Sequence, residues 1–350
     1  MGTIPYTILL YFLFLPFCHT CLIISVDLYP DTLAVLPCNF IVRLLSSCFR
    51  TPLVLIEYGK PTLNRSVELF RTLSQHVIAF HLKMSFNPFI LVTPGATRGL
   101  GLALTRQFLR TTTLPVFATT RTNGDLAVVR KTILDSMEDV RPERLNLIRL
   151  DLTSEESIAS AADELAKSLK HQHLDNAYIH SAFITGGILK PERRPADLTW
   201  QVLKDTFQIN VISHLLIIKH FSRFLPKTKQ TNNNGVDRPS KWVHISARVG
   251  SIEDNRQGGW YSYRSSKSAL NQVVKTFDLH LQQKKIPAIC VAMHPGTVKT
   301  DLSKDFLRAV PNNKVFEPQD AAVNVMNVVE NLKTDQRGKL WDWSGRQIPW

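Results

Sequence analysis

A tyrosine and a lysine four residues apart are the most reactive pair that the sequence offers. Tyr263 and Lys267 lie in YRSSK within a helical pattern, and side chains at this spacing share one face of a helix. A lysine ammonium near a phenol favours the phenolate and lowers the pKa of the tyrosine. Such a tyrosine can exchange a proton with a carbonyl oxygen. The pair predicts acid–base chemistry at a carbonyl or alcohol group, whereas Tyr261 is followed four residues later by Ser265 and lacks this partner.

A glycine-rich turn earlier in the chain predicts a dinucleotide site. Gly95, Gly99 and Gly101 form G-x-x-x-G-x-G between an apolar run and a helical pattern. Glycines let the backbone approach a pyrophosphate, whose charge is held by the N–H groups at the start of the helix. A tight turn without a ligand is the alternative. The position of the turn, at the first strand-to-helix junction, favours the dinucleotide.

The residue after the second predicted strand indicates which dinucleotide binds. NAD sites usually carry an acid there, for the ribose 2′-hydroxyl. This chain has Arg121 at that point, and Arg98 adds a second guanidinium from the glycine turn. Planar guanidinium groups suit a 2′-phosphate. The sequence therefore predicts NADP(H), the alternative being two solvated surface arginines.

Strand-like and helical segments alternate regularly from residue 89 onward, and they must position these groups. The predicted strands are 89–93, 114–120, 145–150, 174–182, 241–246, 287–293 and 338–343. The predicted helices are 99–110, 125–138, 154–170, 198–225, 259–284 and 318–333. Such alternation predicts an α/β fold with one doubly wound domain, in which helices cover both faces of a parallel sheet of about seven strands. The polar stretch 227–240 is expected to be a surface loop.

The chain of 350 residues divides near Met84, into an extension (1–83) and a domain (84–350). Within the extension, Ile8–Val26 has 19 residues without Asp, Glu, Lys or Arg, which is about the length that spans a bilayer. The extension is a dispensable segment, a membrane anchor or a cleaved targeting segment. The first is favoured, because MSFNPFILVTPG at Met84 already opens a complete domain.

The charge and the cysteine content of the chain limit the kinds of ligand and the cellular compartment that can be expected. The net charge of +13 predicts anionic ligands, but the basic residues are scattered, without the aromatic-interleaved strip of a nucleic-acid binder. Four of the five cysteines lie in the first 48 residues, which excludes a disulfide framework for the whole chain. Neither Cys18–Cys21 nor His171–His173 has further ligands at metal-binding spacing, so no metal is expected. The domain keeps only Cys290, as expected in the reducing cytoplasm.

Further motifs join the glycine turn and the tyrosine–lysine pair in a familiar order. They are Asp151 in LDL, Asn210 in FQINV and the segment His294–Thr300, HPGTVKT. In this order the motifs resemble those of a classical short-chain dehydrogenase/reductase over all of Met84–Trp350, which implies a single Rossmann-fold domain. Three segments are most similar to the C-factor-like subset of this family. They are ISARVGSIEDNRQGGWYSYRSSKSALNQ, the PGTVKTDLSK loop and the C-terminal IPW.

The resemblance implies a role for each matched residue. Tyr263 is the general acid/base, Lys267 binds the nicotinamide ribose, Asn210 anchors a proton-relay water, and Asp151 lies by the adenine. The implied cofactor-binding positions are Gly95, Thr97, Arg98, Gly99, Leu100, Gly101, Arg121, Asp151, Leu152, Ser181, Asn210, Tyr263, Lys267, Pro295, Gly296, Val298 and Thr300. Simpler interpretations stay open: a polar helix residue at Asn210, a helix cap at Asp151 and an ordinary turn at Pro295–Gly296.

The sequence departs from the family pattern at three places. Ala247 stands where a serine usually polarises the substrate carbonyl, so Ser246, or else Ser251, is expected to supply the hydroxyl. The usual N-N-A-G is HSAF (180–183) here, which puts Phe183 where a glycine lets the cofactor approach. Pro94 replaces a threonine whose hydroxyl braces the glycine turn.

These features predict an NADP(H)-dependent oxidoreductase acting on a carbonyl or alcohol. Substrate contacts are expected from Ser251–Gly259 and Asp301–Val315. The resemblance further implies a homodimer or homotetramer paired through the helices at 198–225 and 260–284. The alternative, motivated by Ala247 and Phe183, is a dinucleotide-binding regulatory or signalling protein with weak or no catalysis.

Overall fold

The computed structural model of the protein divides into two compact units, Met1–Met84 and Ser85–Trp350. The described residues are 6–9, 23–28, 40–45, 87–174, 176–227, 239–307 and 315–350. Most of the expected surface loop at 227–240 lies outside them, as do residues 308–314 of the expected substrate segment. No helix within the described ranges is long and apolar enough to cross a membrane.

The first unit contains a small antiparallel sheet. Strands β1 (Tyr6–Leu9), β2 (Ile23–Leu28) and β3 (Phe40–Leu45) lie in that order, with β2 in the centre. The apolar segment Ile8–Val26 overlaps β1 and β2 only at its ends, and its remainder lies outside the described residues. The role of this extension therefore stays a prediction.

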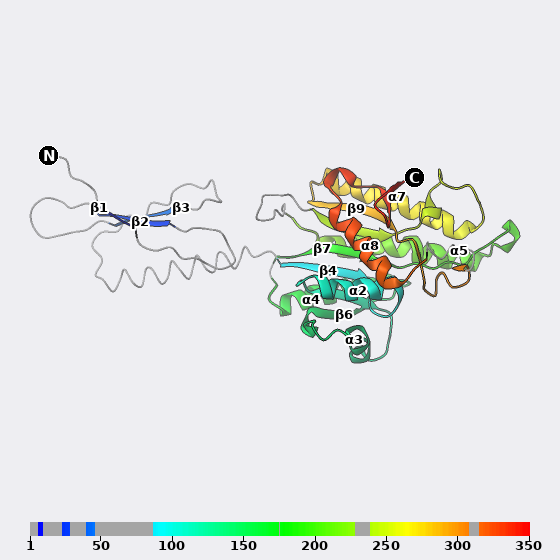
Figure 1. The fold of residues 1–350 in the computed structure, drawn as a ribbon, viewed down its shortest axis with the longest axis horizontal. Helices are drawn as coiled ribbons and strands as arrows, with labels where there is room; N and C mark the ends of the chain where they lie inside the picture. Colours follow the sequence, from blue (N-terminus) through cyan, green and yellow to red (C-terminus); the bar gives the residue numbers. More distant parts are fainter. Residues whose placement is uncertain are drawn as a thin grey trace, which may run out of the picture. The chain divides into compact units, whose positions relative to one another are not determined.

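The second unit is built on an eight-stranded sheet (Figure 1). Its strands are β4 (Asn87–Thr93), β5 (Val116–Thr120), β6 (Leu145–Arg149), β7 (Ala177–Ile184), β8 (Ser240–Ile245), β9 (Ala288–His294), β12 (Leu340–Asp342) and β13 (Gln347–Ile348). Their order is β13-β12-β9-β8-β7-β4-β5-β6, and every neighbouring pair is parallel except β12–β13. The predicted doubly wound parallel sheet is confirmed, and β13 adds an antiparallel edge that the sequence analysis did not anticipate.

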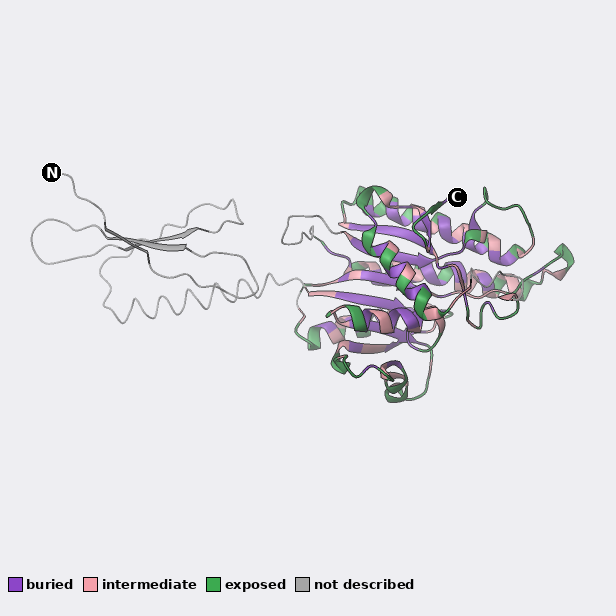
Figure 2. Cartoon of the chain, in the orientation of Figure 1, coloured by how far each residue is buried: buried purple, intermediate pink, exposed green. Residues whose placement is uncertain are grey.

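Helices cover both faces of this sheet. They are α2 (Gly99–Thr111), α3 (Leu126–Leu134), α4 (Glu155–His171), α5 (Trp200–Phe207), α6 (Ser213–Phe221), α7 (Tyr261–Gln283) and α8 (Pro318–Asn331). Side chains of α2, α3 and α8 share one hydrophobic core with the sheet, and those of α4, α6 and α7 share the other. Along β4, Phe89 and Leu91 enter one core while Ile90 and Val92 enter the other. This two-sided burial explains the continuous apolar runs of the central strands (Figure 2).

Two predicted elements differ from the structure. The predicted helix 198–225 is α5 and α6 joined by a π-helical turn at Gln208–Ile212, a feature often associated with functional sites. The predicted strand 174–182 is shifted, because β7 runs two residues further, to Ile184. This shift changes which residues leave the strand at its carboxyl end.

The sheet order places the candidate site. The chain proceeds from β4 outward through β5 to β6, and then crosses to β7 on the other side of β4. In doubly wound sheets, ligands bind at the carboxyl ends of the strands where the order reverses in this way. The glycine turn follows β4, and Arg121 follows β5 at the same edge.

Candidate active site

The glycine turn packs tightly between β4 and α2. A methyl group on Gly101 would lie 2.3 Å from the Pro94 carbonyl oxygen, and one on Gly95 would lie 2.7 Å from that of Val92. Gly99 has a φ of +58°, in the left-handed region that glycine tolerates. The turn thus requires glycine at all three positions and brings backbone to the surface of the site, as a pyrophosphate cradle needs.

Hydroxyl and backbone contacts brace this turn although Pro94 has replaced the usual threonine. The Thr105 hydroxyl lies 2.7 Å from the Gly95 carbonyl oxygen and donates to it. The Thr185 hydroxyl donates to the Pro94 carbonyl at 2.6 Å, and the Gly95 N–H donates to the Thr119 carbonyl at 3.0 Å. The bracing lost at position 94 is therefore supplied from α2, β5 and the end of β7.

The N-terminus of α2 is suited to an anion. Its cap residue, Arg98, makes no side-chain cap hydrogen bond, and no acidic residue lies in the first turn. The first N–H groups of a helix carry a partial positive charge and favour phosphate. Thr97 is exposed just before this end and Leu100 is half-buried just after it. The structure thus places both predicted residues beside the cradle.

A polar hollow of about 360 Å³ lies at the carboxyl ends of β5 and β6. Its lining residues are Arg121, Asn123, Arg149, Leu150, Asp151 and Ser157. Arg121 therefore lines a hollow at the edge of the sheet where the sequence analysis expects the dinucleotide. Arg98 does not line this hollow, and its guanidinium instead contacts Asp301 at 3.6 Å. The second guanidinium is Arg149, which the sequence analysis missed although it stands only two residues before the recognised Asp151.

Asp151 is held in a turn that faces this hollow. Its Oδ1 accepts hydrogen bonds from the Thr153 N–H at 2.9 Å and from the Thr153 hydroxyl at 2.7 Å. Desolvation would raise the pKa of Asp151, but these bonds and the charge of Arg121 outweigh it and hold the pKa below its usual value. The cap of α4 is Ser154, so the interpretation of Asp151 as that cap is wrong. The neighbouring Leu152 is buried.

Tyr263 and Lys267 are buried together in the first two turns of α7. The Lys267 Nζ lies 5.8 Å from the centre of the Tyr263 ring and donates to the Ile245 carbonyl at 2.9 Å. Burial lowers the pKa of Lys267 to about 7, and burial raises the pKa of Tyr263 above its usual value. The direction for Tyr263 is opposite to that expected from the sequence, because burial desolvates the phenolate and so disfavours it. The tyrosine is thus kept protonated.

Asn210 lies in the π-helical turn and is completely buried. Its Oδ1 accepts from the Ile188 N–H at 2.8 Å, and its Nδ2 lies 3.0 Å from both the Ile188 carbonyl and the Ser266 hydroxyl. The side chain therefore clamps the segment after β7 to the face of α7 that bears Lys267. Asn210 is more than a satisfied polar residue of a helix, because it connects three elements at the site.

The serine that was expected to replace the one missing at Ala247 is engaged elsewhere. The Ser246 hydroxyl donates to the Asn271 side chain at 2.7 Å, two turns beyond Tyr263 on α7. The Ser251 hydroxyl lies 3.3 Å from the carbonyl of Trp350. Neither hydroxyl is directed at the Tyr263 side chain by these bonds, and so the expectation for Ser246 is not supported by the geometry.

The residues predicted for the fourth strand require a correction. Phe183 is fully buried inside β7, with its ring 5.3 Å from that of Phe108 in the core. Ser181 is also internal to β7, and its hydroxyl lies 3.0 Å from the His180 ring. The glycine that faces the site is Gly186, three residues later. The predicted obstruction by Phe183 is therefore wrong, because the strand ends later than predicted.

The segment after β9 reaches the glycine turn. Gly296 has a φ of +79°, and Val298 lies in β10 (Thr297–Val298), which pairs with β11 (Val315–Phe316). The Thr300 methyl would lie 3.3 Å from a methyl group on Gly99. Pro295 and Val298 are buried, while Thr300 is half-buried. The structure thus brings this predicted wall of the site against the cradle.

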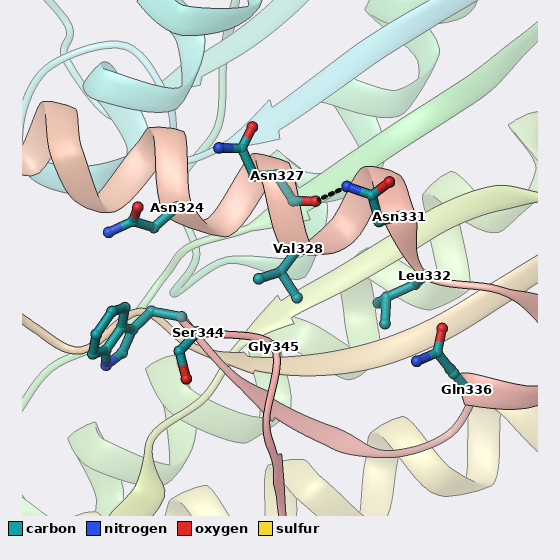
Figure 3. A pocket seen from close by; sticks show the side chains of 9 residues that line it. Asn324, Asn327, Val328, Asn331, Leu332, Gln336, Ser344 and Gly345 are labelled. Atoms are coloured by element: carbon teal, nitrogen blue, oxygen red, sulfur yellow. Dashed lines mark hydrogen bonds between the residues drawn. The ribbon is translucent and has the colours of Figure 1, made fainter.

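A second hollow, of about 390 Å³, lies between α8 and the chain that joins β12 to β13 (Figure 3). Its lining residues are Asn324, Asn327, Val328, Asn331, Leu332, Gln336, Trp343, Ser344 and Gly345. The Asn331 amide donates to the Asn327 carbonyl at 2.8 Å within this wall. None of the predicted catalytic or cofactor-binding residues lines it, so it is separate from the site built above.

Comparisons with known proteins agree with this geometry. The profile of the family described as short chain dehydrogenase matches residues 88–310, more than half of the chain. An uncharacterized oxidoreductase of Schizosaccharomyces pombe is 26% identical over 265 residues, which are 73% of this chain and 95% of that protein. The C-signal of Myxococcus xanthus is 29% identical over 154 residues, 44% of this chain and 82% of that protein.

A solved structure extends the likeness. The NADPH-bound carbonyl reductase from chicken fatty liver is 25% identical, with a TM-score of 0.63. The match covers 76% of this chain and all of the chicken chain. The matched share of this chain corresponds to the length of the second unit.

Proposed function

This chain belongs to the short-chain dehydrogenase family, and from that premise we propose that it is an NADP(H)-dependent oxidoreductase of carbonyl or alcohol groups. The observation that carries the proposal is the burial of Tyr263, Lys267 and Asn210 around one turn at the carboxyl edge of the sheet, beside the glycine cradle. The NADPH-bound carbonyl reductase, whose match covers 76% of this chain, supports both the cofactor and the substrate class.

The residues present fit the proposed cofactor. The cradle at Gly95–Gly101 and the uncapped end of α2 suit the pyrophosphate. Arg121 and Arg149 line one hollow and suit a 2′-phosphate better than a free hydroxyl. NADPH supplies the hydride when it is bound. This charge pattern is the reason to prefer NADPH over NADH.

Tyr263 acts as the proton donor in the direction of carbonyl reduction. Its raised pKa keeps the hydroxyl protonated at neutral pH, ready to donate to an oxygen that gains negative charge. Lys267, with a pKa near 7, is poised to return a proton to the tyrosine. The Trp260 ring lies 6.3 Å from Tyr263 and 5.1 Å from Phe306, and these rings give the substrate side an apolar wall.

The test is Tyr263→Phe in the full chain. NADPH oxidation, followed by its absorbance against a panel of aldehydes and ketones, is expected in the wild type. It is expected to fall at least a thousandfold in the variant, because the proton donor is lost while the ring remains. Calorimetry is expected to give an unchanged Kd for NADPH. Equal rates in the two proteins would contradict the assignment.

A regulatory or signalling protein is the second proposal, and Ala247 is the observation that favours it. The usual hydroxyl is absent at this position, and Ser246 is bonded to Asn271. The proposed C-factor-like subset points the same way, since one relative is named C-signal. Tight NADPH binding with no turnover across the panel would favour this function over the enzyme.

We propose also that the protein pairs with a second copy through α5, α6 and α7. These helices and the π-helical turn between α5 and α6 expose the apolar side chains of Trp200, Ile212, Leu215 and Leu279, including 77% of Trp200. Light scattering of the wild type is expected to give the mass of a dimer or tetramer. Trp200→Glu is expected to shift this mass toward that of the monomer, whereas an unchanged mass would place the interface elsewhere.

A further inference from the structure

Two histidines are buried directly behind the candidate active site. His214 lies on α6, one turn after Asn210, and His244 lies on β8, just before Ile245, whose carbonyl binds Lys267. Both are fully buried. Their Nδ1 atoms are 2.7 Å apart, which requires one of them to donate a hydrogen bond to the other.

The outer partners decide the direction of this bond. The Trp242 Nε1–H lies 3.0 Å from the His244 Nε2, and an indole nitrogen can only donate. The His244 Nε2 is therefore an acceptor, and the proton of neutral His244 lies on Nδ1. His214 consequently accepts at Nδ1 and carries its own proton on Nε2. That Nε2 lies 3.0 Å from the Gly186 carbonyl oxygen and donates to it.

We define the histidine bridge as Trp242, His244 and His214. It runs in one direction, from the indole N–H through both imidazoles to the Gly186 carbonyl. Each of its buried polar atoms has a partner only when both imidazoles are neutral. Burial, with the charge of Lys267, lowers the pKa of His214 to about 3 and that of His244 well below its usual value. The neutral, directed arrangement is thus the one that the surroundings favour.

The acceptor of the bridge belongs to the turn that faces the reacting groups. A methyl group on Gly186 would lie 2.6 Å from the Leu152 side chain. A methyl group on Gly187 would lie 3.6 Å from the Lys267 Nζ and 3.7 Å from the Asn210 Oδ1. The turn therefore lies between Leu152, which follows Asp151 of the polar hollow, on one side and Lys267 and Asn210 on the other.

Two side chains one turn apart fix this turn. Asn210 binds the N–H and the carbonyl of Ile188, and His214 binds the carbonyl of Gly186. Glycines leave the turn with little conformational restriction of its own. Without the bridge the Gly186 carbonyl would lose its hydrogen bond to His214, and Asn210 alone would hold the turn beside Lys267.

We propose that the histidine bridge is a positioning element, which orients the Gly186–Gly187 turn for binding of the dinucleotide. The proposal rests on the proposed function for its ligand. It assigns His214 and His244 roles that act through the turn, without contact to the reacting atoms. The bridge also explains why two polar imidazoles are retained inside an apolar core, where unpaired polar groups are costly.

The first test reads the tautomers in the wild-type full chain. Long-range proton–nitrogen spectra of histidine-labelled protein are expected to show His244 protonated on Nδ1 and His214 on Nε2. His214→Gln and His244→Gln identify the two sets of signals. The opposite tautomer at either residue, or a charged imidazole at neutral pH, would overturn the bridge. This readout does not depend on NADPH, so it separates failure of the bridge from failure of the proposed function.

The second test compares His214→Phe with His214→Gln. The phenyl ring removes both hydrogen-bonding nitrogens, whereas the carboxamide keeps a donor for Gly186. We expect the Kd for NADPH to rise at least tenfold in the phenylalanine variant and to return within threefold of wild type in the glutamine variant.

Ile217→Val is the matched control for general loss of stability. Ile217 lies on the same helix and is fully buried in the core, so its shortening destabilises α6 without touching the turn. We expect its Kd for NADPH to stay within twofold of wild type at a similar loss of thermal stability. Equal Kd values for His214→Phe and Ile217→Val would overturn the positioning role. Should His214→Phe not fold, the glutamine variant and the tautomers decide the question.

Discussion

The substitution Gly101→Ala in the glycine turn would have two effects on stability, and they are opposite in sign. Alanine is better than glycine inside a helix by about 1 kcal/mol, so the change would stabilise α2 if the space were open. The new methyl group would, however, lie 2.3 Å from the Pro94 carbonyl oxygen and 3.2 Å from the Gly95 Cα. Both neighbours are backbone atoms, held by hydrogen bonds from Thr185 and Thr105. The turn must therefore move by about 1 Å to restore ordinary contact.

Overpacking of this kind costs about 1–3 kcal/mol, which equals or exceeds the gain of about 1 kcal/mol in helix propensity. We therefore expect Gly101→Ala to lower the free energy of unfolding by about 0–2 kcal/mol in urea titrations. We expect the Kd for NADPH to rise about tenfold to a hundredfold by calorimetry, since each 1.4 kcal/mol is a factor of about ten.

Gly124→Ala is the matched control, because among the described residues its methyl group would meet only the Thr122 hydroxyl within 4 Å, at 3.3 Å. It adds the same group near the same edge of the sheet, and its Kd is expected to stay within about twofold of wild type. A Gly101→Ala protein that is more stable than wild type, or that binds NADPH equally well, would refute the close packing of the turn.

Three further changes test the charges and hydroxyls of the site. Arg149→Ala is expected to weaken NADPH about tenfold and to leave the Kd for NADH nearly unchanged, because only the 2′-phosphate loses a charge-assisted bond; equal losses for both cofactors would remove Arg149 from the site. Ser246→Ala is expected to keep kcat within about threefold, since its hydroxyl is given to Asn271, whereas a loss of about a hundredfold would show that the hydroxyl serves the substrate. The pKa of Lys267 falls from 10.5 to about 7 on folding, so between these values the unfolded chain binds a proton that the folded chain does not. The free energy of unfolding is therefore expected to rise with pH from about 7 toward 10, and Lys267→Met is expected to flatten this rise in urea titrations at stepped pH.

The parts of the site that could be predicted from sequence are those encoded by short spacing. Gly95–Gly101 connects a strand end to a helix start, and the spacing of four residues from Tyr263 to Lys267 makes about one helical turn. Residues this close in sequence have relative positions that local secondary structure sets, whatever the rest of the chain does. The alternation of apolar runs with helical patterns likewise predicted a sheet between two layers of helices. Strands buried on both faces are apolar throughout, without a polar residue at every second position.

The parts that failed depend on where an element ends or on contacts between distant segments. Phe183 was placed outside the strand because the segment AYIHSAFI carries no turn residue that marks where the strand ends. The pairing of β7 with β4 shows that the strand continues to Ile184. Arg149 was missed because it is the last residue of β6, and the sequence does not show on which side of the strand end its side chain lies. His214 and His244 are 30 residues apart in sequence. A signal existed for His244, since WVHIS places a polar ring inside a buried strand.

These corrections change the balance between the two proposed functions. Two departures from the family pattern, Phe183 and Ala247, first supported a protein with weak catalysis. Phe183 lies in the core beside Phe108, so it no longer argues for an obstructed site, and Gly186 follows it three residues later, packed against Pro94 and Leu152. Of these two departures, Ala247 alone still argues for lost catalysis, and it removes one hydrogen-bond donor while Tyr263 and Lys267 stay in place. A missing donor lowers a rate by a finite factor, which favours an enzyme with altered substrate demands over a protein without turnover.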